Sequence, residues 1–283
     1  MELLRSEPAV FTSLMFVLGL LVGSFLNVVI YRLPKMLESD WQFQCAELRG
    51  DVVAAPAVYN LWMPRSACPY CGHPISALEN IPVISWLALR GRCRDCGTAI
   101  GLRYPTVELL AALLAAALAW KYGPNLMLAG SLILLWALVV LAFIDLDTTL
   151  LPDTLTLPLL WLGLLFNLFG TFTALQSAVI GAMAGYLSLW LVYWAFKLVT
   201  GKEGMGYGDF KLLAAIGAWL GWELLPVTIL LSSLVGALAG LLMIALVRHD
   251  RRIPIPFGPY LAGGGMVALF FGADLMRAYL ALL

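Results

Sequence analysis

Residues 125–147 read NLMLAGSLILLWALVVLAFIDLD and contain no charged side chain before Asp145. About 20 mostly apolar residues are enough for a helix to cross the hydrocarbon core of a bilayer. The stretch therefore predicts a membrane-spanning helix over 125–144. It also predicts that a pair of carboxylates, Asp145 and Asp147, follows this helix at one face of the membrane.

The rest of the chain continues this apolar pattern. Of its 283 residues 62% are hydrophobic and 12% are charged, and the mean hydropathy is +0.91, whereas soluble domains carry about 25% charged residues. We expect an all-α polytopic membrane protein with about eight transmembrane helices, two of them short. The expected spans are 9–31, 105–120, 125–144, 154–172, 174–197, 209–222, 224–247 and 259–282.

Residues 34–104 differ from these spans because they are polar and rich in proline, and we expect them to consist largely of loops. We therefore expect a first transmembrane helix in 1–33, a small soluble domain in 34–104 and a transmembrane domain in 105–283. The first apolar run ends at Tyr31 and Arg32 and lacks a small-residue cleavage site, so we interpret it as a span and not as a cleaved signal peptide.

The distribution of Lys and Arg predicts the orientation, because cytoplasmic loops are enriched in both. With eight spans, fourteen cationic residues fall on the side of the 34–104 domain and three on the other side. The fourteen are Arg32, Lys35, Arg49, Arg65, Arg90, Arg92, Arg94, Arg103, Lys197, Lys202, Lys211, Arg248, Arg251 and Arg252, and the three are Arg5, Lys121 and Arg277. We expect the soluble domain in the cytoplasm and the N-terminus in the periplasm. The net charge of zero gives no indication of nucleic-acid binding.

Two Cys-x-x-Cys motifs lie in the soluble domain, at Cys68 and Cys71 and at Cys93 and Cys96. Four thiolates in this arrangement are typical of a closed tetrahedral zinc site. Two disulfides or free buried cysteines are the alternatives, and the reducing cytoplasm disfavours the disulfides. We predict one structural zinc ion, with Gly72 and Gly97 in tight turns. His73 is a competing ligand, and Cys45 is expected to be a buried thiol.

Two acidic clusters lie at the expected cytoplasmic ends of spans, one around Asp145 and one at Gly206-Tyr207-Gly208-Asp209. Acidic residues in membrane segments are costly and usually functional. Two neighbouring carboxyls share a proton, so that one activates a water while the other polarises a peptide carbonyl. An aspartic peptidase whose catalytic pair takes one carboxyl from each cluster is therefore one interpretation of the two clusters.

Structural interpretations of the carboxylates also remain open. Asp153 is expected to cap the helix that follows it, and Asp147 is either a solvated charge or a partner of the catalytic pair. Asp209 is equally well interpreted as an acid that is favoured at a helix N-terminus. Glu108 is interpreted as a packing carboxylate bonded to a neighbouring helix. A transporter that relays protons through Asp145 and Asp209 is the main alternative function.

Longer stretches carry a resemblance to a known family. They include GSFLNVVIYRLP at 23–34, Arg65-Ser66, Asn80-Ile81-Pro82, Arg90-Gly91-Arg92-Cys93, Arg103-Tyr104-Pro105, the Asp145 cluster, the Gly-x-Gly-Asp motif ending at Asp209, and Pro254 to Pro259. In this order they resemble the type IV prepilin peptidases of bacterial inner membranes, which combine leader peptidase and N-methyltransferase activities.

The resemblance implies that Asp145 and Asp209 are catalytic and that the four cysteines bind zinc. It also implies prepilin and pseudopilin substrates, which lose a basic leader after a glycine and are then methylated on the new N-terminal residue with S-adenosylmethionine. For the methyltransferase, Gly91 and Arg92 are the expected contributors by resemblance alone. An intramembrane protease without methylation and a pilus assembly factor are further alternatives.

Overall fold

The computed structural model describes residues 7–51, 58–247 and 255–281. Four of the cationic residues that were used to predict the orientation lie outside these ranges, as does the first residue of the Pro254 to Pro259 motif. They are Arg5, Arg248, Arg251, Arg252 and Pro254. The chain divides into two compact units, Met1–Pro124 and Asn125–Leu283, which are described separately.

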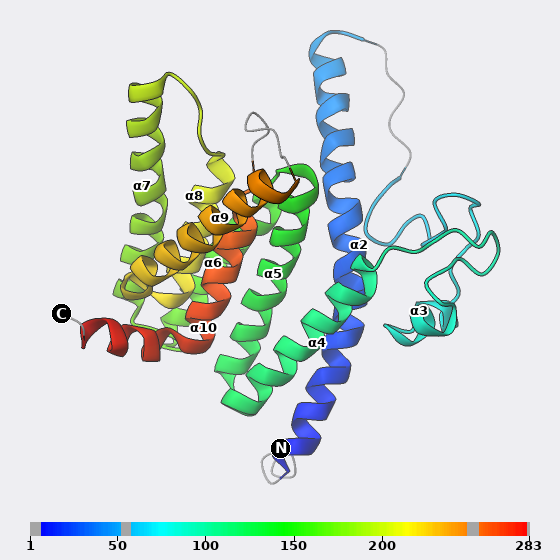
Figure 1. Cartoon of the computed structure of the whole chain (residues 1–283), viewed down its shortest axis with the longest axis horizontal. Coiled ribbons are helices and arrows are strands. Elements are labelled where there is room, and N and C mark those ends of the chain that lie inside the picture. Colours follow the sequence, from blue (N-terminus) through cyan, green and yellow to red (C-terminus); the bar gives the residue numbers. More distant parts are fainter. Residues whose placement is uncertain (1–6, 52–57, 248–254, 282–283) are drawn as a thin grey trace. The chain divides into compact units, whose positions relative to one another are not determined.

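The first unit is built on a close helix pair. Helix α2 (Pro8–Leu48) packs along α4 (Arg103–Tyr122), as Figure 1 shows in blue and green. A Cβ atom at Gly19 would lie 2.6 Å from Ala112 Cα, and one at Gly23 would lie 2.7 Å from Glu108 Cα. Small residues four apart thus let the two backbones meet, as is common between membrane helices.

Helix α2 is longer than the sequence predicted. It passes through Pro34 without ending and continues to Leu48, because residues 35–48 contain many good helix formers. The expectation of a loop-rich start to the polar region is therefore wrong. Cys45 lies on this extension and is exposed, which also corrects its expected burial.

The remainder of the first unit is a small polar region. It contains a 3-10 turn η1 (Leu78–Asn80) and a short helix α3 (Ile84–Ala88). Pairing between strands is limited, within the described residues, to two isolated bridges, Ala67 with Pro74 and Arg92 with Ala99.

The second unit is entirely helical where it is described. It contains α5 (Leu126–Thr148), α6 (Asp153–Leu168), α7 (Leu175–Thr200), α8 (Tyr207–Leu220), η2 (Trp222–Leu224), α9 (Leu225–Val247) and α10 (Gly258–Leu280). Helix α8 has only 14 residues, about 21 Å, but it contacts α6, α7, α9 and α10 and is buried along almost its whole length. A short central helix is therefore enclosed by protein.

Residues 169–174 form a short turn between α6 and α7. The side-chain amide of Asn167 donates to the carbonyls of Ala218 and Trp219, and its oxygen accepts from the backbone of Phe172 and Thr173. One buried side chain thus joins this turn to the end of α8.

Each expected span overlaps one helix, and the all-helical class is confirmed. By length and composition, five of the described helical segments are apolar enough to cross a membrane. They are Pro8–Leu48, Arg103–Tyr122, Leu126–Thr148, Leu175–Thr200 and Trp222–Met243. The segments Asp153–Leu168 and Gly258–Gly272 are apolar but shorter, and the number of spans stays a prediction.

Candidate functional site

The four cysteines come together in the first unit. Their Sγ atoms all lie within 4.8 Å of one another, with Cys68 and Cys96 at 3.8 Å and Cys71 and Cys93 at 3.9 Å. Sulfur atoms about 2.3 Å from a tetrahedral zinc ion are about 3.8 Å apart. The cluster therefore fits a four-coordinate metal ion and leaves no coordination position for a substrate.

Each cysteine pair lies on a similar turn. Cys68 N donates to His73 O and Gly72 N donates to Cys68 O, while Cys93 N and Gly97 N make the equivalent bonds to Thr98 O and Cys93 O. Gly72 and Gly97 have φ angles of +73° and +70°, a region that favours glycine. The predicted glycine turns are confirmed.

His73 lies beside this cluster and does not belong to it. Its Nε2 atom is 3.4 Å from both carboxylate oxygens of Glu79. Hydrogen bonds from the backbone amide and hydroxyl of Ser76 lower the pKa of Glu79 to about 2. His73 is thus engaged by an ionised carboxylate, and the candidate metal site consists of the four cysteines without it.

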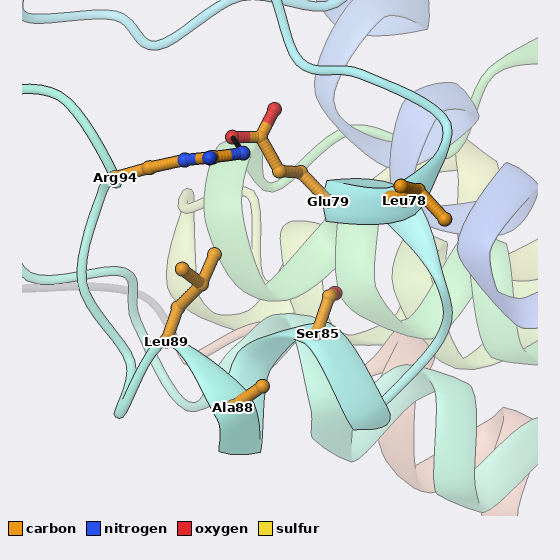
Figure 2. Close-up of a pocket in the computed structure, with 6 residues that line it drawn as sticks. All are labelled: Leu78, Glu79, Ser85, Ala88, Leu89 and Arg94. Carbon is orange, nitrogen blue, oxygen red and sulfur yellow. Dashed lines mark ion pairs between the residues drawn. The ribbon is translucent and has the colours of Figure 1, made fainter.

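A small cavity borders Glu79. Figure 2 shows Glu79 and Arg94 pointing toward each other, with an ion-pair distance of 3.7 Å. The rest of the cavity is lined by Leu78, Ser85, Ala88 and Leu89. The cavity measures about 180 Å³, below the roughly 300–1,000 Å³ of typical small-molecule sites. It is too small to enclose a ligand of the size of S-adenosylmethionine.

Gly91 has a structural role that the sequence did not indicate. Its φ angle is +65°, and a Cβ atom there would lie 2.7 Å from the ring of Trp86. The ring nitrogen of Trp86 donates to Ile100 O, and Ile100 N donates to Gly91 O. Packing and backbone conformation thus explain this glycine without a cofactor, whereas the neighbouring Arg92 is exposed.

Glu108 fastens the polar region to the helix pair. Its carboxylate accepts from the backbone amide of Val83, which precedes α3, and from the hydroxyl of Ser24 in α2. The interpretation of Glu108 as a packing carboxylate bonded to a neighbouring helix is therefore confirmed.

Asp145 lies in the last turn of α5 and is only 5% exposed. Its Oδ2 atom accepts a 2.9 Å hydrogen bond from Gly258 N, the first residue of α10. Amides at this position lack a partner within their own helix and carry part of the positive end of its dipole. The Gly258 amide thus supplies the Asp145 carboxylate with a hydrogen-bond donor, whereas the C-terminal turn of a helix presents carbonyls, which only accept.

Asp209 lies in the first turn of α8 and is 7% exposed. Asp209 follows Gly208, which lies against Leu151, and Leu151 also lies against Gly258, the hydrogen-bond partner of Asp145. The structure thus brings the two carboxyls into one site although 64 positions separate them in the sequence. Each carboxyl thus faces the N-terminus of a helix. The Asp145 carboxyl accepts from the first residue of α10, and Asp209 belongs to the first turn of α8.

Close glycine contacts shape the surroundings of the pair. A Cβ atom at Gly208 would lie 2.7 Å from Leu151 Cβ, and one at Gly258 would lie 2.6 Å from Asp145 Oδ2 and 3.2 Å from Leu151 Cδ2. Leu151 thus fills the space between the two glycine segments. Neither Leu151 nor Gly258 was predicted to belong to the site, although Gly258 lies in one of the stretches that carry the resemblance.

The other acidic residues of the first cluster are exposed. Asp153 does not cap α6 as expected, because Pro152 occupies the N-cap position and Asp153 is the first helical residue. Both of its oxygens instead accept from Lys211 Nζ at 2.7 Å, a partly exposed ion pair that joins α6 to α8. Asp147 is exposed on the last turn of α5.

An aromatic cluster supports the segment before Asp209. Tyr193 of α7 contacts Tyr207 and Phe210 with ring centroids 5.3 and 5.7 Å apart. Lys197, one turn further along α7, donates to Tyr193 Oη and to Glu203 at 2.8 Å. The loop that carries the Gly-x-Gly-Asp motif is therefore attached to α7 at both of its ends.

Comparison with known proteins yields matches along nearly the whole chain. Residues 17–122 match the family described as Bacterial Peptidase A24 N-terminal domain, and residues 132–241 match the Type IV leader peptidase family. No solved structure matches the chain.

Three similar relatives carry the name prepilin leader peptidase/N-methyltransferase. The protein of Aeromonas hydrophila is 60% identical and that of Pseudomonas aeruginosa 55%, each over 99% of this chain and 97% of the relative. The protein of Burkholderia pseudomallei is 54% identical over 90% of this chain and 84% of the relative. By these matches the chain belongs to the type IV leader peptidase family.

Proposed function

We propose that this chain is a bifunctional enzyme of the inner membrane. It cleaves the basic leader from prepilins and pseudopilins and then methylates the new N-terminal residue. The names of its relatives support both activities. The observation that carries the peptidase assignment is the pair of buried carboxyls, Asp145 and Asp209, which share one site at helix ends.

The proposed cleavage needs these two groups and one water. The ionised carboxyl takes a proton from the water, and the water oxygen bonds to the carbonyl carbon of the scissile peptide. The protonated carboxyl donates its proton to the carbonyl oxygen. The C–N bond then breaks as the leaving nitrogen receives a proton from one carboxyl, and a hydroxyl of the tetrahedral intermediate returns its proton to the other. The Gly258 amide holds Asp145 in place for this exchange.

The proposed orientation brings this pair to the cytoplasmic face, where the excess of Lys and Arg lies. A prepilin that has its basic leader in the cytoplasm and its apolar helix in the bilayer presents its scissile bond at that face. Enzyme and substrate are thus both embedded in lipid, and diffusion in the membrane brings them together.

For the metal centre we propose zinc, held by Cys68, Cys71, Cys93 and Cys96. Its role would be structural, since four thiolates complete the tetrahedral shell. Small polar domains of this length commonly depend on a bound metal. We further propose that 34–104 is the cytoplasmic zinc-binding domain, between a first transmembrane helix in 1–33 and an aspartic peptidase domain in 105–283.

The methyltransferase assignment rests on the family alone. S-adenosylmethionine supplies the methyl group, and the proposed contributors are Gly91 and Arg92. Because Gly91 packs against Trp86, a substitution there changes the domain itself. Arg92 is exposed and is the better residue with which to test a direct role.

A direct test is mass spectrometry of pilin N-termini from cells with and without this protein. We expect mature, methylated pilins only in its presence. Full-length pilins in both strains would contradict the peptidase. Cleaved but unmethylated pilins in the producing strain would contradict the methyltransferase and favour the alternative of a protease without methylation.

A further inference from the structure

The turn at residues 59–63 is fixed to helix α2 by a buried arginine. Arg32 is 7% exposed, and its guanidinium donates to Asn60 O at 2.9 Å and to Pro64 O at 2.7 Å. The same guanidinium lies over the ring of Tyr59. Both ends of the turn are therefore held against α2 near Arg32.

The turn also satisfies much of its own backbone. The side-chain oxygen of Asn60 accepts from the amides of Trp62 and Met63, and Asn60 N donates to Met63 O. Together with the bond from Arg32 to Asn60 O, these contacts pair five of the ten backbone N–H and C=O groups of residues 59–63. The hydrated headgroup region still offers water to the remaining groups, whereas the hydrocarbon core does not.

The turn extends along α2 from Arg32 toward the apolar part of the helix. The ring of Trp62 stacks on Phe25 with centroids 5.6 Å apart. Phe25 precedes Arg32 by seven residues, about 10 Å along a helix. Residues 8–31 contain no charged side chain and span about 36 Å, so Phe25 lies within the roughly 30 Å hydrocarbon core when this stretch is centred in it.

Within the described residues of the first unit, the side chains of Trp62 and Met63 are largely uncovered. Trp62 is 76% exposed and Met63 is 61% exposed, although Trp62 lies at the depth of Phe25. We propose that residues 59–63 form an interfacial anchor, which places the side chains of Trp62 and Met63 among the lipid chains just below the headgroups. Tryptophan is the residue type that membrane interfaces favour.

This anchor would hold the cysteine-containing region against the bilayer surface. Cys68 follows Pro64 by only four residues, so the first pair of metal ligands lies close to the anchored segment along the chain. The proposed zinc domain would then remain at the membrane surface, where a membrane-embedded substrate presents its N-terminus.

The test uses the full chain in vesicles of phosphatidylethanolamine and phosphatidylglycerol whose acyl chains carry bromine, a contact quencher of tryptophan fluorescence. The chain has 10 tryptophans, so the Trp62 signal is the difference between the wild type and Trp62→Phe. We expect the brominated chains to quench this difference signal and aqueous iodide to leave it unchanged.

Trp41→Phe is the matched control. Trp41 is half exposed on the same helix, nine residues and about 13 Å beyond Arg32, so iodide should quench its signal and brominated lipid should not. If Trp62→Phe loses metal or fails to insert, Trp62→Tyr replaces it. A Trp62 signal that iodide quenches would overturn the anchor. Shielding of Trp62 from both quenchers would indicate a protein partner and would overturn it as well.

Discussion

At the scale of single residues, the site depends on how a buried carboxylate is accommodated near the end of a helix. Asp145 lies in the last turn of α5, where the helix dipole opposes a negative charge. The Gly258 amide compensates for this, and the approach is so close that no side chain fits at position 258.

Gly258→Ala should therefore impair leader cleavage while the protein still inserts. Its Cβ atom would lie 2.6 Å from Asp145 Oδ2 and would displace the carboxyl from its partner. Gly263→Ala in the same helix is the control, because nothing lies within 4 Å of its Cβ position. Cleavage rates of the two purified variants on one prepilin decide the question, and equal rates would contradict the proposed role of Gly258.

The sequence predicted some residues of this site and not others. Asp145 and Asp209 were predicted because burying an acidic side chain at the end of a membrane span is energetically costly and usually marks a functional residue. The hydrogen bond between Asp145 and Gly258 joins positions 113 apart, which no local pattern indicates. Asp153 was assigned wrongly as a cap because its pairing with Lys211 depends on how α8 packs beside α6.

At the scale of elements, the two cysteine turns have equivalent hydrogen bonds and glycine conformations. Their spacing alone predicted the cluster, because Cys-x-x-Cys turns are local structures. Helix lengths were harder to predict. Helix α2 continues past Pro34, whereas the 14 residues of α8 match the short span expected at 209–222.

Metal analysis of the purified protein should find about one zinc ion per chain. The double variant Cys68→Ser, Cys71→Ser should lose the metal and the folded state of its domain, because metal binding and folding are coupled in such sites. Cys45→Ser, an exposed thiol outside the cluster, should keep full occupancy. Zinc retained by the double variant would contradict the assignment.

Gly23→Ala should weaken the pairing of α2 with α4. The added methyl would lie 2.7 Å from Glu108 Cα, and overpacking of this kind costs about 1–3 kcal/mol. Thermal unfolding in detergent reports the change. Gly101→Ala in the same unit, where nothing lies within 4 Å, should unfold as the wild type does. An unchanged unfolding temperature for Gly23→Ala would show that the contact is not tight.

At the scale of the whole molecule, the two proposed activities belong to different units of the chain. The carboxyl pair lies in Asn125–Leu283, and Gly91 and Arg92 lie in Met1–Pro124. Methyl transfer needs a neutral amine and a positioned cofactor, not two carboxyls that share a proton. The activities should therefore be separable.

Arg92→Gln should lower methylation more than cleavage, and Asp209→Asn should still methylate a pilin that is already cleaved. Labelled S-adenosylmethionine and a pre-cleaved pilin measure the second effect without the peptidase step. Absence of label transfer by the Asp209→Asn protein would mean that both steps use this aspartate.

The most direct test of the peptidase assignment is leader cleavage by Asp145→Asn and Asp209→Asn, each reconstituted in lipid with one prepilin. Loss of a proton-transferring group lowers a reaction rate about 10²–10⁴-fold, so we expect the cleavage rate of each variant to fall by at least that factor. The exposed Asp147→Asn should keep measurable activity. Cleavage near the wild-type rate by either Asp145→Asn or Asp209→Asn would contradict the catalytic pair.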